Sequence, residues 1–267
     1  MIIDFHTHVF PDKIAQKTVD FLAVKGGTQP DYNGTVEGLE NAIDTAGVSL
    51  AVCLPVVTKP SQFESILNFA VSLNEKYKGN KILSFAGIHP LCDDIEGKLQ
   101  AVKNANIKGI KIHPDYQETY IDDENYIKIL KVCKSLDLIV VTHAGIDCGY
   151  RECTVKCPPH RLKTVIEKVG HSKFVLAHMG GAEMVEDFLN EVAGKDVYID
   201  TAYVLKYLTK EQFLTILEKH GEDKILFATD APWSNAKQDL EILKSFVSNG
   251  ETLDKILYKN AVKLLGL

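Results

Sequence analysis

Short apolar runs recur along the whole chain, separated by longer segments in which apolar and polar residues mix. Eight of these runs are rich in Val and Ile and have the length of a β-strand. They cover residues 2–6, 50–55, 82–88, 107–113, 138–143, 173–178, 197–201 and 225–229. Strands that are covered on both faces, as in a parallel sheet, have this nearly continuous apolar composition. The pattern therefore predicts eight buried parallel strands.

The segments between the runs carry apolar residues at helical spacing. The clearest are residues 124–135, 162–169, 212–220 and 238–247, in which apolar side chains recur every three or four positions. Residues typical of helix starts occur at Thr35, Asp123, Pro159 and Thr209. Gly47, Gly170, Gly194 and Gly221 follow expected helices, at positions where a left-handed residue commonly ends a helix. The segment from residue 251 onward predicts one or two closing helices.

Strands and helices alternate throughout the 267 residues, which predicts repeated βα units. Eight units in a chain of roughly 250 residues favour an α/β fold of the (β/α)8 TIM-barrel type. We expect this barrel to be a single domain over residues 1–267, because no low-complexity segment or Pro/Gly/Ser-rich linker divides the chain. A doubly wound open sheet is the structural alternative.

Ionisable side chains stand at the ends of four expected strands. His6 and His8 end the first strand, His143 and His178 end the fifth and sixth, and Asp230 follows the eighth. Side chains two positions apart on a strand share a face, so both imidazoles of the first strand can reach one ion. Each group alone also has a structural interpretation, such as a hydrogen bond or a helix cap. Together they would lie on the catalytic face of a barrel, and three His with one Asp suit zinc or a similar divalent ion.

These side chains belong to four short motifs, Asp4-x-His6-x-His8, Thr142-His143-Ala144-Gly145, His178-Met179-Gly180-Gly181 and Thr229-Asp230-x-Pro232. With these motifs the chain resembles the amidohydrolase superfamily. More closely, it resembles the amidohydrolase-related branch that includes aminocarboxymuconate-semialdehyde decarboxylase. The motifs span residues 4–232, so the resemblance covers the whole expected barrel.

The resemblance implies a role for each of these side chains. His6, His8 and His143 would bind a metal ion. Asp230 would bind the same ion and orient or deprotonate its water, and His178 would be the acid or base beside it. The implied cofactor is one divalent ion per chain, with Zn²⁺ ahead of Mn²⁺ and a second ion as the less favoured alternative.

Further polar side chains are candidates for contacts with substrate. Lys111 and His113 share a face of the fourth strand, and some amidohydrolases carry a modified lysine on that strand that bridges two metals. The alternative is that Lys111 pairs with an interior carboxylate such as Asp200. His89, at the end of the third strand, is a further candidate. Arg151, in the loop after the fifth strand, is another, although it could equally be a solvated surface charge. Trp233 could line the pocket or pack on the last helix.

The leading hypothesis is a metal-dependent hydrolase that acts on a small molecule through a metal-activated water. A non-oxidative decarboxylase on the same metal site is the alternative, although the chain has only two arginines to bind carboxylate-rich substrates. A TatD-type nuclease also starts with an HxH motif, but such enzymes usually carry a glutamate where this chain has Lys111. The net charge of −6 gives no electrostatic reason to expect a nucleic-acid partner.

No signal-peptide pattern and no apolar run of membrane-spanning length is present, so we expect a cytoplasmic protein without a membrane partner. Reduced thiols are then expected for the six cysteines. Cys148, Cys153 and Cys157 crowd one loop and could form a zinc clip, but redox-active or incidental thiols are favoured because the paired CxxC spacing is missing. A homodimer is implied by the resemblance alone. His160, His171 and His220 are expected on the surface.

Overall fold

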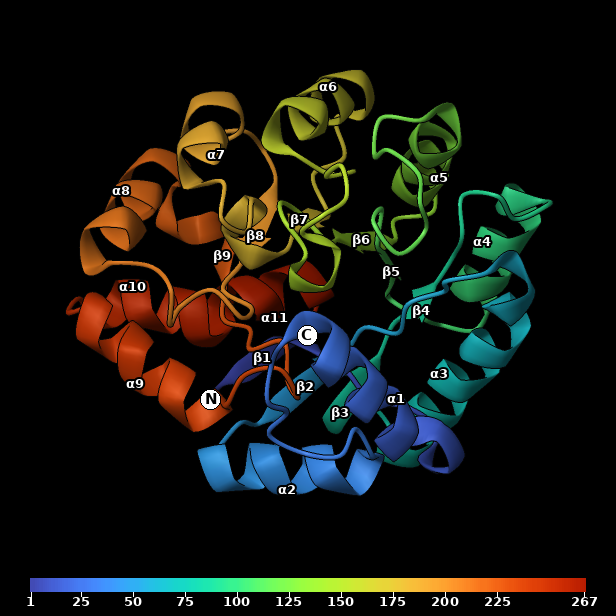
Figure 1. Cartoon of the computed structure of the whole chain (residues 1–267), viewed down its shortest axis with the longest axis horizontal. Coiled ribbons are helices and arrows are strands. Elements are labelled where there is room, and N and C mark those ends of the chain that lie inside the picture. Colours follow the sequence, from blue (N-terminus) through green and yellow to red (C-terminus); the bar gives the residue numbers. More distant parts are fainter.

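Parallel strands arranged in a ring form the centre of the molecule, and helices surround them (Figure 1). The structure is a computed structural model that describes residues 1–267. The strands are β1 (Ile3–Thr7), β2 (Leu50–Cys53), β3 (Lys81–Ser84), β4 (Ala86–Gly87), β5 (Gly109–Ile112), β6 (Ile139–Thr142), β7 (Phe174–Leu176), β8 (Tyr198–Asp200) and β9 (Ile225–Leu226). Each expected run contains a strand, and the third is divided into β3 and β4. The predicted (β/α)8 barrel is therefore confirmed.

The strands pair in parallel within two sheets, β1-β2-β3 and β4-β5-β6-β7-β8-β9. Hydrogen bonds outside these sheets close the ring at its last junction, between the first and last strands. The N–H of Phe5 donates to the carbonyl of Phe227 at 2.9 Å, and the N–H of Asp230 donates to the carbonyl of His6 at 2.8 Å. The last strand is thereby joined to the first.

A buried carboxylate reinforces this junction. Asp4, at the start of β1, accepts hydrogen bonds from the Thr229 hydroxyl at 2.6 Å and from the Thr229 N–H at 3.0 Å. Burial raises the pKa of Asp4 to about 7, although these hydrogen bonds lower it. Because Thr229 immediately precedes Asp230, the same contact places the last strand's carboxylate beside the first strand's histidines.

Helices connect the strands and cover the outside of the barrel (Figure 1). They are α1 (Asp12–Gly26), α2 (Val36–Ala46), α3 (Phe63–Tyr77), α4 (Ile95–Asn104), α5 (Glu124–Ser135), α6 (Pro159–Val169), α7 (Val185–Glu191), α8 (Lys210–His220), α9 (Ala236–Phe246), α10 (Gly250–Asp254) and α11 (Asn260–Leu265). A π-helical turn, η5 (Lys255–Lys259), joins the last two. The expected helix starts at Thr35 and Thr209 are confirmed, since both side chains accept a backbone N–H three residues on. No helix combines the length and the apolar character that a membrane span requires.

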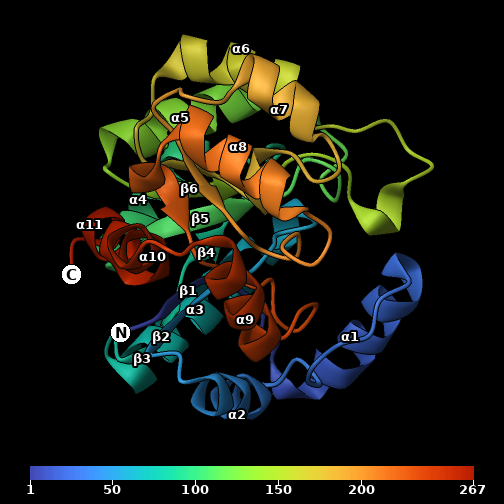
Figure 2. The same cartoon turned by 90° about the vertical axis from the view of Figure 1, so that its left-hand side faces the viewer.

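Helix α1 is an addition to the eight βα units and was not predicted. Its apolar residues occupy two sides, so the pattern has no single apolar face. Ala15 and Val19 are buried, whereas Phe21 is 65% exposed and Val24 is 85% exposed. The helix lies on the same side of the barrel as the loop that contains the short 3-10 helix η2 (Cys148–Tyr150), which it contacts (Figure 2).

Beside the site, β1 contains one residue more than the paired segment of β2. Asp4 pairs with Ala51 and Thr7 with Cys53, so three steps along β1 face two steps along β2. Regular alternation would place Phe5 and His6 on opposite faces of the sheet. The shift instead lets Phe5 pack in the apolar interior, where Ile3 also lies, while His6 contacts interior polar groups. Irregularities of this kind often occur beside active sites.

One apolar cluster fills the interior of the barrel below the site. It combines alternate strand residues, among them Leu50, Val52 and Val141, with Ala261, Leu264 and Leu265 of the final helical segment. A larger cluster lies between the strands and the surrounding helices. The end of the barrel away from the polar groups is therefore closed by α11, and a ligand can enter only from the opposite end.

The expectation that His171 and His220 lie on the surface is wrong. Both are buried, at 5% and 6% exposure, because each links a helix end to the strand beside it. His171 hydrogen-bonds the Leu138 carbonyl at 2.9 Å. His220 accepts the Gly194 N–H on Nδ1, and its Nε2 donates to the Val197 carbonyl at 3.1 Å.

Acid should destabilise the fold partly through His220. Burial lowers its pKa to about 4, against about 6.5 for an unfolded histidine. The stability that this neutral ring contributes is therefore complete above pH 6.5 and is lost as the pH falls toward 4. Between pH 7 and pH 4 the free energy of unfolding should fall in both the wild type and His220→Gln. We expect the fall in the wild type to be larger by on the order of 2–3 kcal/mol. Urea unfolding at both pH values measures this. Exposed His160→Gln is the control, and equal pH dependence in all three proteins would contradict the assignment.

Candidate metal centre and active site

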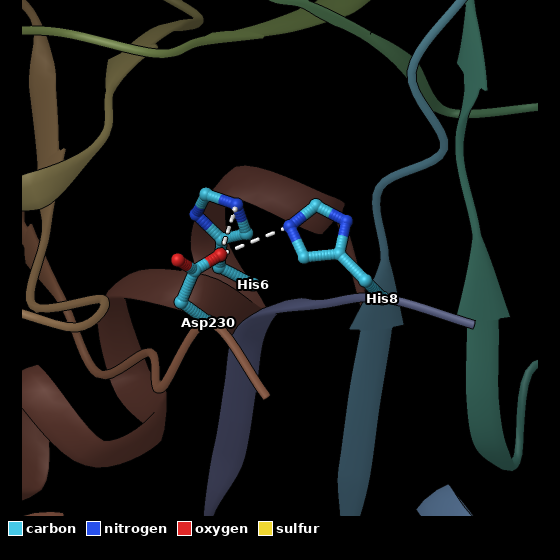
Figure 3. Close-up of side chains that lie close together, drawn as sticks. All are labelled: His6, His8 and Asp230. Atoms are coloured by element: carbon cyan, nitrogen blue, oxygen red, sulfur yellow. Dashed lines mark hydrogen bonds and ion pairs between the residues drawn. The ribbon is translucent and has the colours of Figure 1, made fainter. Parts of the chain in front are cut away.

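Three side chains at or beyond the ends of the first and last strands converge at the floor of the barrel mouth (Figure 3). His6 Nε2 lies 3.2 Å from Asp230 Oδ1, and His8 Nε2 lies 2.9 Å from the same oxygen. The potential ligand atoms of these three residues all lie within 4.8 Å of one another. Two imidazoles and a carboxylate at such spacing are a donor set that suits a divalent transition-metal ion.

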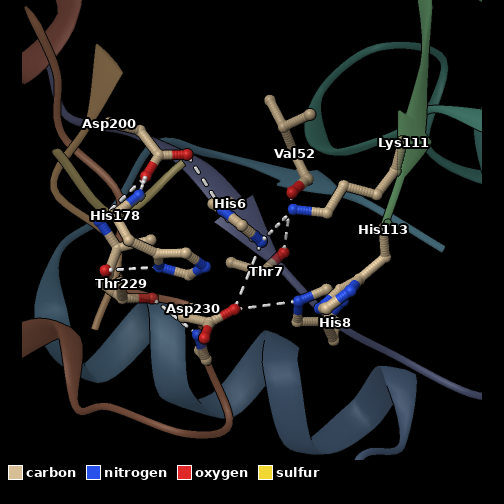
Figure 4. A network of polar contacts seen from close by, with 12 residues as sticks. His6, Thr7, His8, Val52, Lys111, His113, His178, Asp200, Thr229 and Asp230 are labelled. Carbon is tan, nitrogen blue, oxygen red and sulfur yellow. Dashed lines mark hydrogen bonds and ion pairs between the residues drawn. The ribbon is translucent and has the colours of Figure 1, made fainter. Parts of the chain in front are cut away.

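The orientation of His6 is controlled by a second carboxylate, Asp200 (Figure 4). His6 Nδ1 lies 2.9 Å from Asp200 Oδ2, and a carboxylate oxygen accepts, so Nδ1 carries the proton. The other oxygen of Asp200 accepts the N–H of His178 at 2.9 Å and that of Ala202 at 3.1 Å. The lone pair of His6 Nε2 is therefore directed toward Asp230. Buried carboxylates behind metal-binding histidines commonly act in this way.

Lys111 adds a positive charge beside this donor set. Its Nζ lies 3.1 Å from His6 Nε2, and the side chain is 1% exposed. Burial lowers the pKa of Lys111 to about 8, against the opposing effect of Asp200 and Asp230. Burial and the nearby lysine hold the pKa of His6 well below its usual value. His6 is thus neutral, which is the form of imidazole that binds a metal.

Backbone conformation at His178 and Asp230 is unusual for residues with side chains. His178 has a φ of 58° and Asp230 a φ of 67°, both in the left-handed region, and Met179 follows with 53°. Such conformations cost free energy and often occur where a functional side chain must be aimed. His178 Nδ1 donates to the Ala202 carbonyl at 2.9 Å, so its Nε2 carries the lone pair. Its ring centre lies 5.5 Å from that of His6 and 4.8 Å from that of His143.

His143 lies in a second, adjacent group with His113 and Asp147. The rings of His143 and His113 are stacked 4.3 Å apart, and His113 Nε2 is 3.4 Å from Asp147 Oδ2. His143 Nε2 is buried and has no hydrogen-bond partner. The structure thus brings three of the four expected ligands together, and ligation of the same ion by His143 stays a prediction.

The two groups line one pocket of about 960 Å³. Of the candidate substrate contacts, Lys111, His113 and Trp233 also line it. His89 is buried outside the lining, where its Nδ1 accepts the Leu91 N–H. Arg151 lies outside it as well, 53% exposed and paired with Glu183. The two groups of potential metal ligands include none of Cys148, Cys153 and Cys157, and these cysteines differ widely in exposure.

Several site residues were not recognised from the sequence. The sequence suggests Asp200 only as a possible partner of Lys111, yet its carboxylate contacts His6. A charged residue at the end of an apolar run was the available signal. Asp147 and Tyr116 come from loops, and Tyr116 stacks on His113 with ring centres 3.8 Å apart. No periodic pattern marks loop positions, so these two could not be found in that way.

The donor set fits a divalent ion on two observations. His6 Nε2 and Asp230 Oδ1 are both electron-pair donors, because the proton of His6 is on Nδ1, and they lie only 3.2 Å apart. A positive charge between them would remove their repulsion. In addition, His143 lines the same pocket, and its buried Nε2 has no hydrogen-bond partner, with Asp115 Oδ2 at 4.0 Å. His6, His8 and Asp230 would hold the ion, with His143 as the expected fourth ligand.

A family model described as amidohydrolase matches residues 3–267. No curated protein matches the chain. Among solved structures, an uncharacterized TIM-barrel protein from Bordetella bronchiseptica is 16% identical with a TM-score of 0.78, covering 99% of this chain and 98% of that one. A probable 2-pyrone-4,6-dicarboxylic acid hydrolase from Acinetobacter baumannii is 18% identical (TM-score 0.71; 100% and 99% covered). A manganese complex of 5-carboxyvanillate decarboxylase from Novosphingobium aromaticivorans is 14% identical (TM-score 0.72; 100% and 96% covered).

Metal content should depend on the two histidines of the first strand. We expect protein purified without chelators to contain about one divalent ion per chain, as a mononuclear site requires. His6→Ala/His8→Ala should contain none, and His160→Ala, which alters an exposed histidine, should match the wild type. Elemental analysis measures all three. Absence of metal from the wild type, even after addition of Zn²⁺ or Mn²⁺, would contradict the metal centre.

Asp200→Asn should weaken metal binding without removing a ligand. The Asn oxygen can still accept the two backbone N–H groups, but its NH₂ would face His6 Nδ1 and favour the tautomer with the proton on Nε2. We expect an affinity about 10–100-fold lower, measured by competition with a chromophoric chelator. Asp196→Asn, at an exposed carboxylate paired with Lys224, is the matched control. Unchanged affinity in Asp200→Asn would show that Asp200 does not control the His6 tautomer.

Proposed function

Because the chain belongs to the amidohydrolase family, we propose that it is a metal-dependent hydrolase of a small molecule. The observation that carries this proposal is the convergence of His6, His8 and Asp230 below the free Nε2 of His178. A divalent ion bound there would polarise a carbonyl group and lower the pKa of water. Hydrolysis needs, in addition, a base for the water and an acid for the leaving group, and the chain offers both.

Asp230 is suited to be the base. Its Oδ1 faces the two histidines, which leaves Oδ2 to orient the attacking water and accept its proton. His178 is suited to be the acid, because its Nδ1–H is held by the Ala202 carbonyl and its Nε2 can carry a proton to the leaving group. Their left-handed backbone holds both side chains in place before substrate arrives.

The pocket offers few cationic side chains to a substrate that carries several negative charges. The only lysines that line it are Lys25 and Lys111, whereas five carboxylates do, namely Asp147, Glu183, Glu186, Asp187 and Asp230. Such a lining disfavours substrates with several carboxylates and also the phosphates of a nucleic acid.

Decarboxylation of a monocarboxylic acid is the second candidate. Lys111 supports it, because a buried ammonium group at the pocket floor can pair with one substrate carboxylate. His113, on the same strand, could then hydrogen-bond the acid. Measurement of CO2 release from aromatic and dienoic acids separates this reaction from the hydrolysis of esters and amides.

Asp230→Asn should abolish most turnover and keep the fold. Asn tolerates the left-handed backbone that this position requires, but it cannot accept the proton of water. We expect kcat for p-nitrophenyl acetate, with metal supplied, to fall about 10²–10⁴-fold. Circular dichroism checks the fold, and Asp196→Asn is the matched control. A kcat like that of the wild type in Asp230→Asn would overturn the role of this carboxylate.

A further inference from the structure

The pocket is much larger than its metal centre. Its volume of about 960 Å³ is at the upper end of what drug-sized ligands fill. The polar floor occupies only the inner part, and apolar side chains make up nearly half of the lining residues, 21 of 44. A substrate that reached only the floor would leave this outer, apolar part filled with water.

Helix α1 contributes one apolar wall. Ile14, Phe21 and Leu22 line the pocket together with Thr18 and Lys25, and their spacing of three or four places them on one face of the helix. Phe21 remains 65% exposed although it borders the cavity, so a ligand there would remove a large apolar surface from water. Val24, one turn away, does not line the pocket, although it is 85% exposed.

Helix α3 contributes further apolar surface to the same cavity. Ile66 and Phe69 line it and are both half-buried. Glu186 and Asp187 add two exposed carboxylates to the lining, whereas Glu183 is paired with Arg151 and Lys25 of α1 adds one positive charge. The outer pocket therefore combines apolar walls with a small excess of negative charge. A negatively charged end on the ligand would be repelled there, whereas an uncharged one would not.

We propose that the substrate carries, beside its hydrolysable carbonyl group, an elongated and uncharged apolar substituent, either an acyl chain or an aryl group, that packs against α1 and α3. This inference rests on the proposed function, because it places the carbonyl group at the metal centre. The observation that carries it is the continuity of one cavity from His6, His8 and Asp230 to Phe21 and Phe69.

Binding of a homologous series tests the proposal without requiring turnover. The probes are acetohydroxamate, butanohydroxamate, hexanohydroxamate and octanohydroxamate, added to the metal-loaded protein. Trp233 is the only tryptophan and lines the pocket, so its fluorescence reports binding. We expect Kd to fall about fourfold for each added methylene until the apolar walls are covered. Suberic acid monohydroxamate, which ends in a carboxylate, should bind at least about tenfold more weakly than octanohydroxamate.

Variants of α1 supply a matched comparison. In Phe21→Ser the Kd of octanohydroxamate should rise about tenfold while that of acetohydroxamate stays unchanged. Val24→Ser changes a residue on the same helix that is even more exposed but lies outside the pocket, and it should leave the whole series unchanged. A Kd that does not depend on chain length, or equal effects of both variants, would overturn the inference. A dimer interface on α1 would also overturn the inference. Sedimentation would then show a dimer that both variants dissociate, while the Kd values of the hydroxamates would not change.

The same series separates this inference from the proposed function. Binding that tightens with chain length, together with no hydrolysis of the p-nitrophenyl esters of acetate to octanoate, would keep the apolar site and overturn the hydrolase. Hydrolysis of the acetate ester, with no effect of chain length on either binding or kcat/KM, would keep the hydrolase and overturn the apolar site. Failure of every hydroxamate to bind would overturn the inference.

Discussion

The site depends on closure of the barrel between its first and last strands. His6 belongs to β1, His8 directly follows it and Asp230 follows β9, so more than two hundred residues of chain separate the two halves of the donor set. Asp4 binds Thr229 directly, and backbone hydrogen bonds join Phe5 to Phe227 and Asp230 to His6. A ring of parallel strands satisfies its own edge hydrogen bonds, and in doing so it brings the two ends of the chain into register. The geometry of the metal centre is thus a consequence of how the sheet closes.

Asp200 links the two histidines on which the proposed chemistry depends. One of its oxygens binds the imidazole of His6, and the other accepts the backbone N–H of His178. The Ala202 carbonyl accepts a hydrogen bond from His178 Nδ1–H. Burial raises the pKa of Asp200, while the neighbouring His178 and Lys111 oppose that shift. His6 and His178 are in this way oriented by one short segment, residues 200–202, at the end of β8.

Much of the fold and part of the site could be predicted from the sequence, for physical reasons. Buried parallel strands require nearly continuous apolar runs, and the ends of those runs marked His6, His8, His178 and Asp230. What escaped depends on tertiary contacts. Helix α1 divides its apolar residues between two sides, so no periodic face indicates it. The burial of His171 and His220 depends on their tertiary contacts with the carbonyls that directly precede β6 and β8, so the prediction that they lie on the surface was wrong. The stacking of His143 on His113 depends on the angle between neighbouring strands, which neither motif encodes.

The extra residue in β1 determines which related sequences can form the same site. Side chains on a regular strand alternate between its two faces, and the additional residue between Asp4 and Thr7 allows Phe5 to fill the core while His6 contacts Asp200 and Asp230. Loss of one residue there would turn one of the two out of the barrel, even if both histidines were kept. The number of residues in this segment therefore belongs to the signature of the site, alongside their identity. An alignment that places a gap between Asp4 and Thr7 would match the two histidines in proteins whose first strand lacks the extra residue. The aligned histidines of such proteins would not share this geometry.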